Sequence, residues 1–339
     1  MGHKKKGAPS SHSLHQQAYD RLTAMLAFGD SRRADKDEDP GISADKIYSF
    51  ATYKTYWKHI KYFIKWVKEK HPEVTTLKKA KKLVPEWLQS RVDEKLSAWT
   101  IQTEAAALNK LYGITPDDPS RFQPPRRRKE DITRSRGTKV RDAHFSEAAN
   151  EELVNFCKAC GFRRNVLERL KGGDLYDRER AETALEAAKN AGDTALAKAF
   201  SDGLRTFTEQ TYFILHRNDK GGKTRLSPIV GPKADKVVQR MKDTPKGEKV
   251  WQYVNTNCDV HGYRSDYATF LYKQYARPIE TLDFHNKIRC ADGKYRSEIY
   301  VCRGSESGKR LDRRAIGIIS VALGHEREDT AIANYIRNL

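Results

Sequence analysis

The sequence has no long hydrophobic run. In its 339 residues, no apolar stretch approaches the roughly 20 residues that a membrane-spanning helix needs. Its basic start, MGHKKKGAPSSHS, is not followed by the apolar segment of a secretory signal. With 38% hydrophobic residues and this length, we expect two packed domains with appendages in a cytoplasmic protein.

Cysteine is scarce, and the five residues follow no metal-site pattern. An odd number of cysteines without a secretory signal indicates a reducing compartment. A zinc site would need a second matched pair beside the single C-x-x-C, and that pair is absent. We therefore expect packed thiols. The cysteines are Cys157, Cys160, Cys258, Cys290 and Cys302.

Two further patterns are missing. The phosphate-binding pattern G-x-x-x-x-G-K-[ST] does not occur, and neither does a clustered set of acidic residues that would hold a metal. The sequence therefore favours a function without ATP, metal or other cofactor.

Acidic residues are too few to balance the basic ones. Lysine and arginine number 64 against 45 aspartates and glutamates, which gives a formal net charge of +19 and a pI near 9.6. Such an excess favours a polyanionic partner, because each neutralised phosphate releases condensed counterions. Membrane-surface binding is the competing interpretation, but it needs a basic amphipathic helix or a lipidation signal, and neither is found. The charge therefore indicates nucleic acid.

The first half of the chain has a helical pattern. Residues 1–42 are interpreted as a basic N-terminal arm with one short helix around His12 to Phe28. Residues 43–114 predict a small helical domain. Apolar residues recur there at steps of three and four, which is typical of one helix face. They are Ile47, Phe50, Tyr53, Trp57, Ile60, Ile64 and Val67 in the first helix, Val84, Trp87, Leu88 and Val92 in the second, and Ile101, Ala105, Leu108 and Leu111 in the third.

Basic residues concentrate in this domain and after it. Residues 44–115 contain 14 Lys/Arg against 7 Asp/Glu. Residues 115–140 are rich in proline and charge, lack a hydrophobic period, and predict an interdomain linker. We expect both regions to contact a DNA backbone, although a solvated helical bundle and a solvated tether would have the same composition. The candidate DNA-binding residues are Lys54, Lys58, Lys61, Arg126, Arg127, Arg128 and Lys129.

Residues 141–339 predict a mixed second domain with inserts near 178–203 and 278–312. The fold class expected for the whole chain is mostly α with a small β-sheet. The expected elements are a helix from Ser146 to Cys160, a helical pair broken at 190–193, a β-hairpin TYFILHR-NDKGGK-TRLSPIV, helices near 235–241, 263–275 and 315–323, and a strand in YRSEIYVC.

Four motifs follow one another in the second domain. They are ACGFRRNVLERLKGGDL at 159–175, DKGGKTRLSPIV at 219–230, HGYRSDYATFLY at 261–272 and VALGHEREDTAIANYI at 321–336. Each combines arginine, lysine, histidine or tyrosine with a turn or a helix start. Their order and the terminal tyrosine are more specific than any single motif.

With these motifs the chain resembles the tyrosine recombinase (phage integrase) family. The resemblance covers residues 43–339, and it implies a helical core-binding domain, an α+β catalytic domain and a 3′-phosphotyrosine intermediate that needs neither ATP nor metal. It places the catalytic residues on Arg163, Lys220 (with Lys223 as the alternate lysine), His261, Arg264, His325 and Tyr335.

These residue types suit cleavage of a phosphodiester. Two arginines can hold the non-bridging oxygens in bidentate fashion as negative charge builds on them. Tyrosine is a weak nucleophile at neutral pH and needs a neighbouring base or a cationic field. A lysine on a hairpin tip can give a proton to the departing 5′-oxygen. His261 and Arg264, three residues apart on a helix, can share one phosphate, and His325 can hydrogen-bond it as well.

Several alternatives remain open from the sequence. The segment from Tyr300 to Arg303 competes with the pair His261 and Arg264 as a Tyr-x-x-Arg form of the third motif. The same chemistry would serve a telomere resolvase or a chromosome-dimer resolvase. A DNA-binding protein that has lost catalysis is the alternative from another class.

The resemblance also implies partners. Double-stranded DNA is the expected substrate, and four protomers would assemble on two duplexes to integrate, excise or transpose a mobile element. Accessory DNA-bending proteins and a place at the nucleoid follow from the same resemblance.

Overall fold

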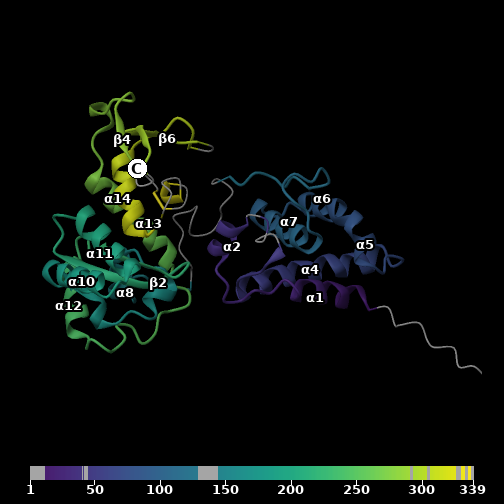
Figure 1. Ribbon diagram of the computed structural model, residues 1–339, viewed down its shortest axis with the longest axis horizontal. Helices are drawn as coiled ribbons and strands as arrows, with labels where there is room; N and C mark the ends of the chain where they lie inside the picture. Colours follow the sequence, from purple (N-terminus) through teal and green to yellow (C-terminus); the bar gives the residue numbers. More distant parts are fainter. Residues whose placement is uncertain are drawn as a thin grey trace, which may run out of the picture. The chain divides into compact units, whose positions relative to one another are not determined.

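The chain forms two compact units, residues 1–127 and 128–339. The computed structural model describes residues 12–39, 41, 45–128, 144–290, 293–303, 306–325, 330–332 and 335–336. Both units are predominantly helical, and the strands form small antiparallel sheets (Figure 1). This confirms the expected composition of mostly α structure with a little β.

The first unit is a helical bundle around one core. Its long helix α4 buries Ile60, Phe63, Ile64 and Val67, so the predicted apolar stripe is the packed face. Ser49 caps α4 by accepting a hydrogen bond from the backbone N–H of Thr52. The helices are α1 (Leu14–Thr23), α2 (Arg32–Glu38), α4 (Phe50–Lys70), α5 (Leu77–Ala80), the short 3₁₀ helix η1 (Lys81–Leu83), α6 (Val84–Asp93) and α7 (Ala98–Tyr112).

Part of the expected N-terminal arm belongs to this bundle. Helix α1 buries Leu14, Ala18 and Leu22 in the same core as α4. The short helix that was predicted there has an apolar face at steps of four, and α4 and α7 cover that face. Helix α1, which lies within the expected arm, is therefore part of the core of the first unit.

The second unit surrounds a three-stranded sheet. Its elements in chain order are α8 (Glu151–Cys160), α9 (Arg164–Leu167), η3 (Gly172–Asp174), β1 (Leu175–Asp177), α10 (Arg178–Asn190), α11 (Thr194–Thr206), β2 (Tyr212–Asp219), β3 (Lys223–Pro228), α12 (Ala234–Asp243), α13 (Val260–Tyr275), η4 (Ile279–Thr281), β4 (Lys287–Arg289), β5 (Tyr295–Ser297), β6 (Ile299–Val301), β7 (Arg310–Asp312) and α14 (Arg313–Leu323).

The sheet has the order β1-β2-β3 and is antiparallel throughout. Alternate residues of β2 enter two different cores, since Phe213 and Leu215 pack with α11 and α14 while Ile214 packs with α8 and α12. Burial on both faces explains the continuous apolar run FIL. The predicted hairpin is confirmed, with Gly221 and Gly222 at positive φ in its turn.

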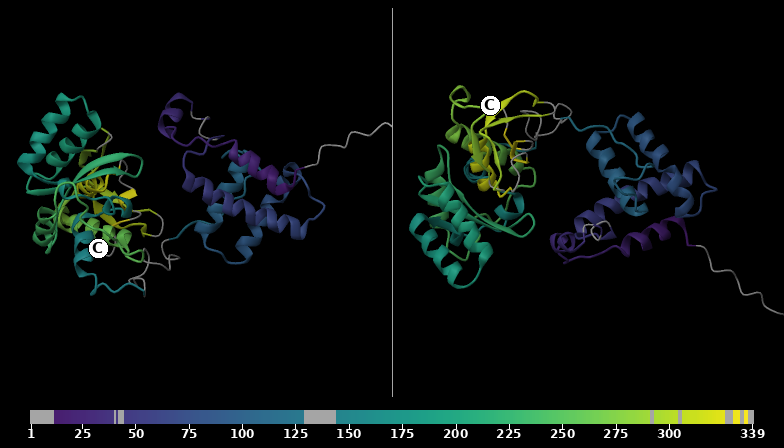
Figure 2. Two further views of the ribbon diagram at one scale, coloured as in Figure 1. Left: turned by 90° about the horizontal axis from the view of Figure 1, so that it is seen from below. Right: turned by 45° about the horizontal axis from the view of Figure 1, so that its top comes forward.

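The first insert is the antiparallel helical pair α10 and α11. The two helices lie side by side (Figure 2), and α11 covers β3. Asp177 and Asp193 cap their N-termini through side-chain hydrogen bonds to backbone N–H groups. The predicted break at 190–193 is confirmed.

The second insert contains two small hairpins, β4-β5 and β6-β7. One strand was expected in YRSEIYVC, but Glu298 divides it into β5 and β6. The Glu298 carboxylate turns inward and accepts hydrogen bonds from the Asp283 backbone N–H at 2.9 Å and from Arg277 at 2.9 Å. Arg277 also forms a two-pronged pair with Asp312, so these contacts fix the insert beside α13 and α14.

Among the residues that the structure describes, none of the helices is both long and apolar enough to cross a membrane.

Candidate active site

Two glycine turns lie near the starts of two motifs. Gly161 follows α8 with φ +60°, and Gly324 follows α14 with φ +65°. A Cβ atom at Gly161 would lie 2.3 Å from the ring of Tyr267, and one at Gly324 would lie 2.8 Å from Cδ of Arg225. Only glycine meets both requirements without strain. These turns direct the next residues of the chain toward the sheet.

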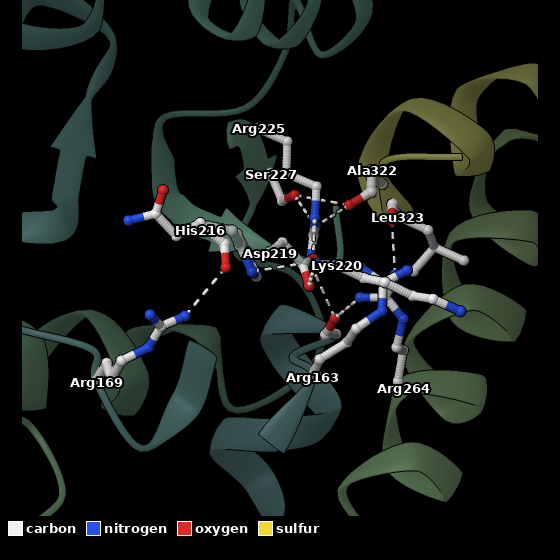
Figure 3. Close-up of polar contacts among 12 residues, drawn as sticks. Arg163, Arg169, His216, Asp219, Lys220, Arg225, Ser227, Arg264, Ala322 and Leu323 are labelled. Atoms are coloured by element: carbon white, nitrogen blue, oxygen red, sulfur yellow. Dashed lines mark hydrogen bonds and ion pairs between the residues drawn. The ribbon is translucent and has the colours of Figure 1, made fainter. Parts of the chain in front are cut away.

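Arg225, on β3, joins three of the four motifs. Its guanidinium donates to the carbonyl oxygens of Ala322 and Gly161, to Ser227 Oγ and to His216 Nδ1, the last at 2.8 Å (Figure 3). The side chain is 6% exposed. A single buried cation thus connects the hairpin, the turn after α8 and the end of α14.

Arg264, on α13, joins the same segments from the other side. Its guanidinium donates to the Leu323 carbonyl oxygen at 2.6 Å and to the Gly161 carbonyl oxygen. Asp259 caps α13 by accepting from the Gly262 N–H at 2.9 Å, which fixes the helix start on which Arg264 lies. All four motifs therefore meet at one place.

Tyr335 lies against the histidines and an arginine of these motifs. Its ring stacks on His261 with the ring centroids 5.0 Å apart and the planes 16° apart. The ring of His325 lies 5.2 Å away, and Cζ of Arg264 lies 5.1 Å from the Tyr335 ring centroid. Tyr335 is 6% exposed. Four residues that the motifs selected therefore share one cluster.

Arg163 meets a buried carboxylate. Its Nη1 lies 2.5 Å from Oδ2 of Asp219, which Nε of Arg225 also approaches at 3.3 Å. Burial alone would raise the pKa of Asp219, but the hydrogen bond from Arg163 and the charges of both arginines outweigh it and lower the pKa to about 2. The carboxylate is ionised at neutral pH.

The site has more positive charge than this carboxylate neutralises. Burial, together with the neighbouring charges of Arg225 and Arg163, lowers the pKa of Arg264 to about 9. Burial and the three arginines lower the pKa of His325 to about 3, so its imidazole is neutral at pH 7. The buried Nε2 of His325 and Nε of Arg264 have no hydrogen-bond partner among the described residues. Such a cluster of donors can hydrogen-bond an anion with several oxygens.

The structure also places the competing candidates. Tyr300 lies on β6, where its ring packs under the guanidinium of Arg313 at 5.1 Å, and Arg303 is exposed. The cluster around Tyr335 therefore contains His261 and Arg264. The two candidate lysines, Lys220 and Lys223, are both exposed at the tip of the β2-β3 hairpin.

The predicted DNA-binding lysines of the first unit share one helix face. Lys54, Lys58 and Lys61 are exposed on α4, at steps of four and three residues. In the linker, Arg126, Arg127 and Arg128 are exposed, and Cζ of Arg127 lies 5.8 Å from the ring centroid of Trp99. Lys129 lies outside the described residues.

Sequence reasoning gave no role to Asp219, Arg225 or His216. Arg225 is a lone charge in the apolar strand TRLSPIV, and His216 ends the apolar run FILH. An unpaired polar residue in an apolar strand is a signal that could have identified both. Arg164, next to Arg163, donates to the backbone carbonyls of residues 255, 256 and 258 and so fixes the loop before α13.

The cysteines do not take part in this cluster. Cys157 and Cys160 are buried within α8, as expected of packed thiols. No group of three or more His, Cys, Asp or Glu residues suited to a metal ion occurs in the described part of the chain.

Comparison with known proteins gives little beyond this geometry. No family model matches the chain, and no curated protein matches it. A crystal structure of XerA recombinase is similar over 95% of this chain and 94% of that chain, at 14% sequence identity and a TM-score of 0.25. A similarity of this degree carries no functional argument, which rests instead on the cluster around Tyr335.

Proposed function

We propose that the protein cuts and rejoins DNA strands by tyrosine recombinase chemistry, with Tyr335 as the nucleophile. The observation that carries this proposal is the enclosure of the Tyr335 ring by His261, His325 and Arg264. The charge of Arg163 also acts on Arg264 and His325. These residues come from three of the four motifs, and the hydrogen bonds of Arg225 and Arg264 hold those motifs together.

The reaction exchanges one phosphate ester for another. The Tyr335 oxygen attacks the phosphorus, a 3′-phosphotyrosine bond forms, and the bond to the 5′-oxygen breaks. The phenolic proton passes to His261, whose imidazole stacks on the ring. Lys220, with Lys223 as the alternate, protonates the departing 5′-oxygen. Rejoining runs these steps in reverse with a 5′-hydroxyl as the nucleophile.

The arginines stabilise the charge that develops during attack. Arg163 and Arg264 donate to the non-bridging oxygens, and the Nε2 atom of His325 adds a further contact. The basic face of α4 and the arginines of the linker hold the flanking duplex through its phosphates. We further propose that four protomers act on two duplexes, with accessory DNA-bending proteins, to integrate, excise or transpose a mobile element.

The test is covalent trapping. Duplex fragments from the flanks of the protein's own gene are mixed with the protein in EDTA, denatured in detergent, and examined for protein-linked 3′ ends. The wild type and Tyr300→Phe, a matched tyrosine of the second insert, should both form adducts. Tyr335→Phe should form none while its DNA affinity stays within about threefold.

The outcomes separate the alternatives. Adducts that persist in Tyr335→Phe would refute the assignment. Strong low-salt DNA binding without any wild-type adduct would favour a DNA-binding protein that has lost catalysis. Among the products, hairpin ends would indicate telomere resolution, whereas joined heterologous strands would indicate integration.

A further inference from the structure

The site holds a buried carboxylate that the proposed reaction does not use. Asp219 ends β2, and its side chain is 1% exposed. Oδ2 contacts Nη1 of Arg163 at 2.5 Å and Nε of Arg225 at 3.3 Å, while Oδ1 accepts from the Lys220 backbone N–H at 2.7 Å (Figure 3). One side chain therefore joins a proposed phosphate-binding arginine, a fixed arginine and the hairpin tip.

The two arginines on Asp219 differ in their freedom. Arg225 is fixed by the carbonyls of Ala322 and Gly161 and by two side chains of the sheet. The side chain of Arg163 is 20% exposed and starts from the N-cap of the four-residue helix α9. Asp219 therefore connects the less constrained guanidinium to the fixed one.

The contact leaves Arg163 able to hold a phosphate. A guanidinium has five N–H donors in a rigid planar fork, and the pair with Asp219 uses Nη1. Fixing one edge of the fork sets the direction of the others. Asp219 supplies one negative charge beside three guanidinium groups, those of Arg163, Arg225 and Arg264. Net positive charge therefore remains to bind a phosphate.

We propose that Asp219 is a positioning residue that orients Arg163 toward the phosphate that Tyr335 attacks. This inference rests on the proposed tyrosine chemistry. Asp219 does not touch the DNA; it acts through Arg163, and Arg225 keeps it in place. Its loss should slow the cleavage step more than it weakens DNA binding, because transition-state charge depends on the direction of the donors.

The decisive variant is Asp219→Asn. The asparagine carbonyl can still accept from the Lys220 N–H, but the pair with Arg163 loses its charge and its acceptor. Asp219→Glu keeps the negative charge on a side chain that is longer by one methylene group. Asp174→Asn is the matched control, because Asp174 also accepts from an arginine (Arg217, 3.0 Å) and from a backbone N–H (Lys171, 3.0 Å).

The assay is single-turnover cleavage of a DNA substrate from which the covalent adduct can be trapped. DNA affinity and the midpoint of thermal unfolding are measured for each variant. We expect Asp219→Asn to cleave about 100-fold more slowly, the effect of losing one transition-state donor, with affinity within about threefold. Asp219→Glu should recover part of the rate. Asp174→Asn should cleave like the wild type.

A second substrate shows through which residue Asp219 acts. In this substrate, sulfur replaces the 5′-bridging oxygen, so the leaving group is a thiolate. Because a thiol has a pKa of only about 8.5, the thiolate can leave without a proton donor. This substrate should restore cleavage by Lys220→Ala. It should not restore cleavage by Asp219→Asn, because the charge on the non-bridging oxygens still needs Arg163.

Three results would overturn the inference. They are a wild-type rate in Asp219→Asn, recovery of its rate with the sulfur substrate, and an equal loss of rate and DNA affinity in both Asp219 variants. The first two would leave the proposed function intact. Failure of the proposed function looks different: the wild type forms no adduct, or Tyr335→Phe retains it, and the role of Asp219 falls with it.

Discussion

Single residues of the site show how buried arginines control their neighbours. His216 and His325 both lie beside Arg225 and Arg264, and burial together with those charges lowers the pKa of each imidazole, that of His325 to about 3. In the unfolded chain a histidine titrates near pH 6.5. The unfolded state therefore binds more protons than the folded state at mildly acidic pH.

This difference predicts a loss of stability in mild acid. The stability that a histidine gains by staying neutral is present above a pH of about 6.5 and is lost as the pH falls below it. The free energy of unfolding, measured in urea without phosphate, should decrease from pH 7 to pH 5. The decrease should be smaller in His325→Gln than in the wild type. In His285→Gln, which replaces an exposed histidine of the same unit, it should equal that of the wild type. An equal pH dependence in all three proteins would contradict the account.

Candidate site residues were predictable only where a local motif contains them. Short motifs identified Arg163, His325 and Tyr335, and the structure brings His325 and Tyr335 into contact. Asp219 and Arg225 escaped because their contacts with the other motifs, to Arg163 and to the Ala322 carbonyl, are distant in sequence. The contact of Arg225 with the Ala322 carbonyl spans 97 positions, and no local pattern records such a contact.

At the scale of elements, the turns that end α8 and α14 depend on glycine. In Gly161→Ala, the positive φ costs about 1–2 kcal/mol, and the close approach to the Tyr267 ring adds about 1–3 kcal/mol. Gly192→Ala is the control, because Gly192 has φ +71° and open space around it. Urea unfolding should show a loss of about 1 kcal/mol for Gly192→Ala and at least twice that for Gly161→Ala. Equal losses would mean that the packing against Tyr267 is unimportant.

Elements with a clear period were predictable, and irregular ones were not. The stripe of α4, the hairpin β2-β3 and the helical pair α10 and α11 follow from spacing and turn residues. The division of YRSEIYVC at Glu298 depends on Arg277 and Asp283, which lie 21 and 15 positions away. The strand β1 is three residues long and was also missed, because its pairing with β2 is what defines it.

At the scale of the whole molecule, the net charge of +19 favours a polyanionic partner. The first unit has its own core, so its lysines can change without disturbing the second unit's cluster. If Lys54, Lys58 and Lys61 each contact one phosphate, replacing all three by glutamine should reduce the slope of log affinity against log salt by about 2–3.

The matched control for this prediction is Lys78, Lys79 and Lys82 replaced by glutamine. These lysines are exposed in the same unit but lie on α5 and η1, away from the α4 face. The two triple variants have the same net charge. A difference between their salt slopes therefore shows that the position of the lysines on the unit matters for DNA binding. Equal slopes would reduce the role of α4 to general electrostatic attraction.

The central claim is that Tyr335 becomes covalently joined to DNA, and the most direct measurement is to locate that bond. The trapped adduct is digested with nuclease and trypsin and sequenced by mass spectrometry. We expect a nucleotide on the tryptic peptide 328–337, EDTAIANYIR, attached to its single tyrosine, Tyr335. A nucleotide on any other residue, Tyr300 included, would contradict it.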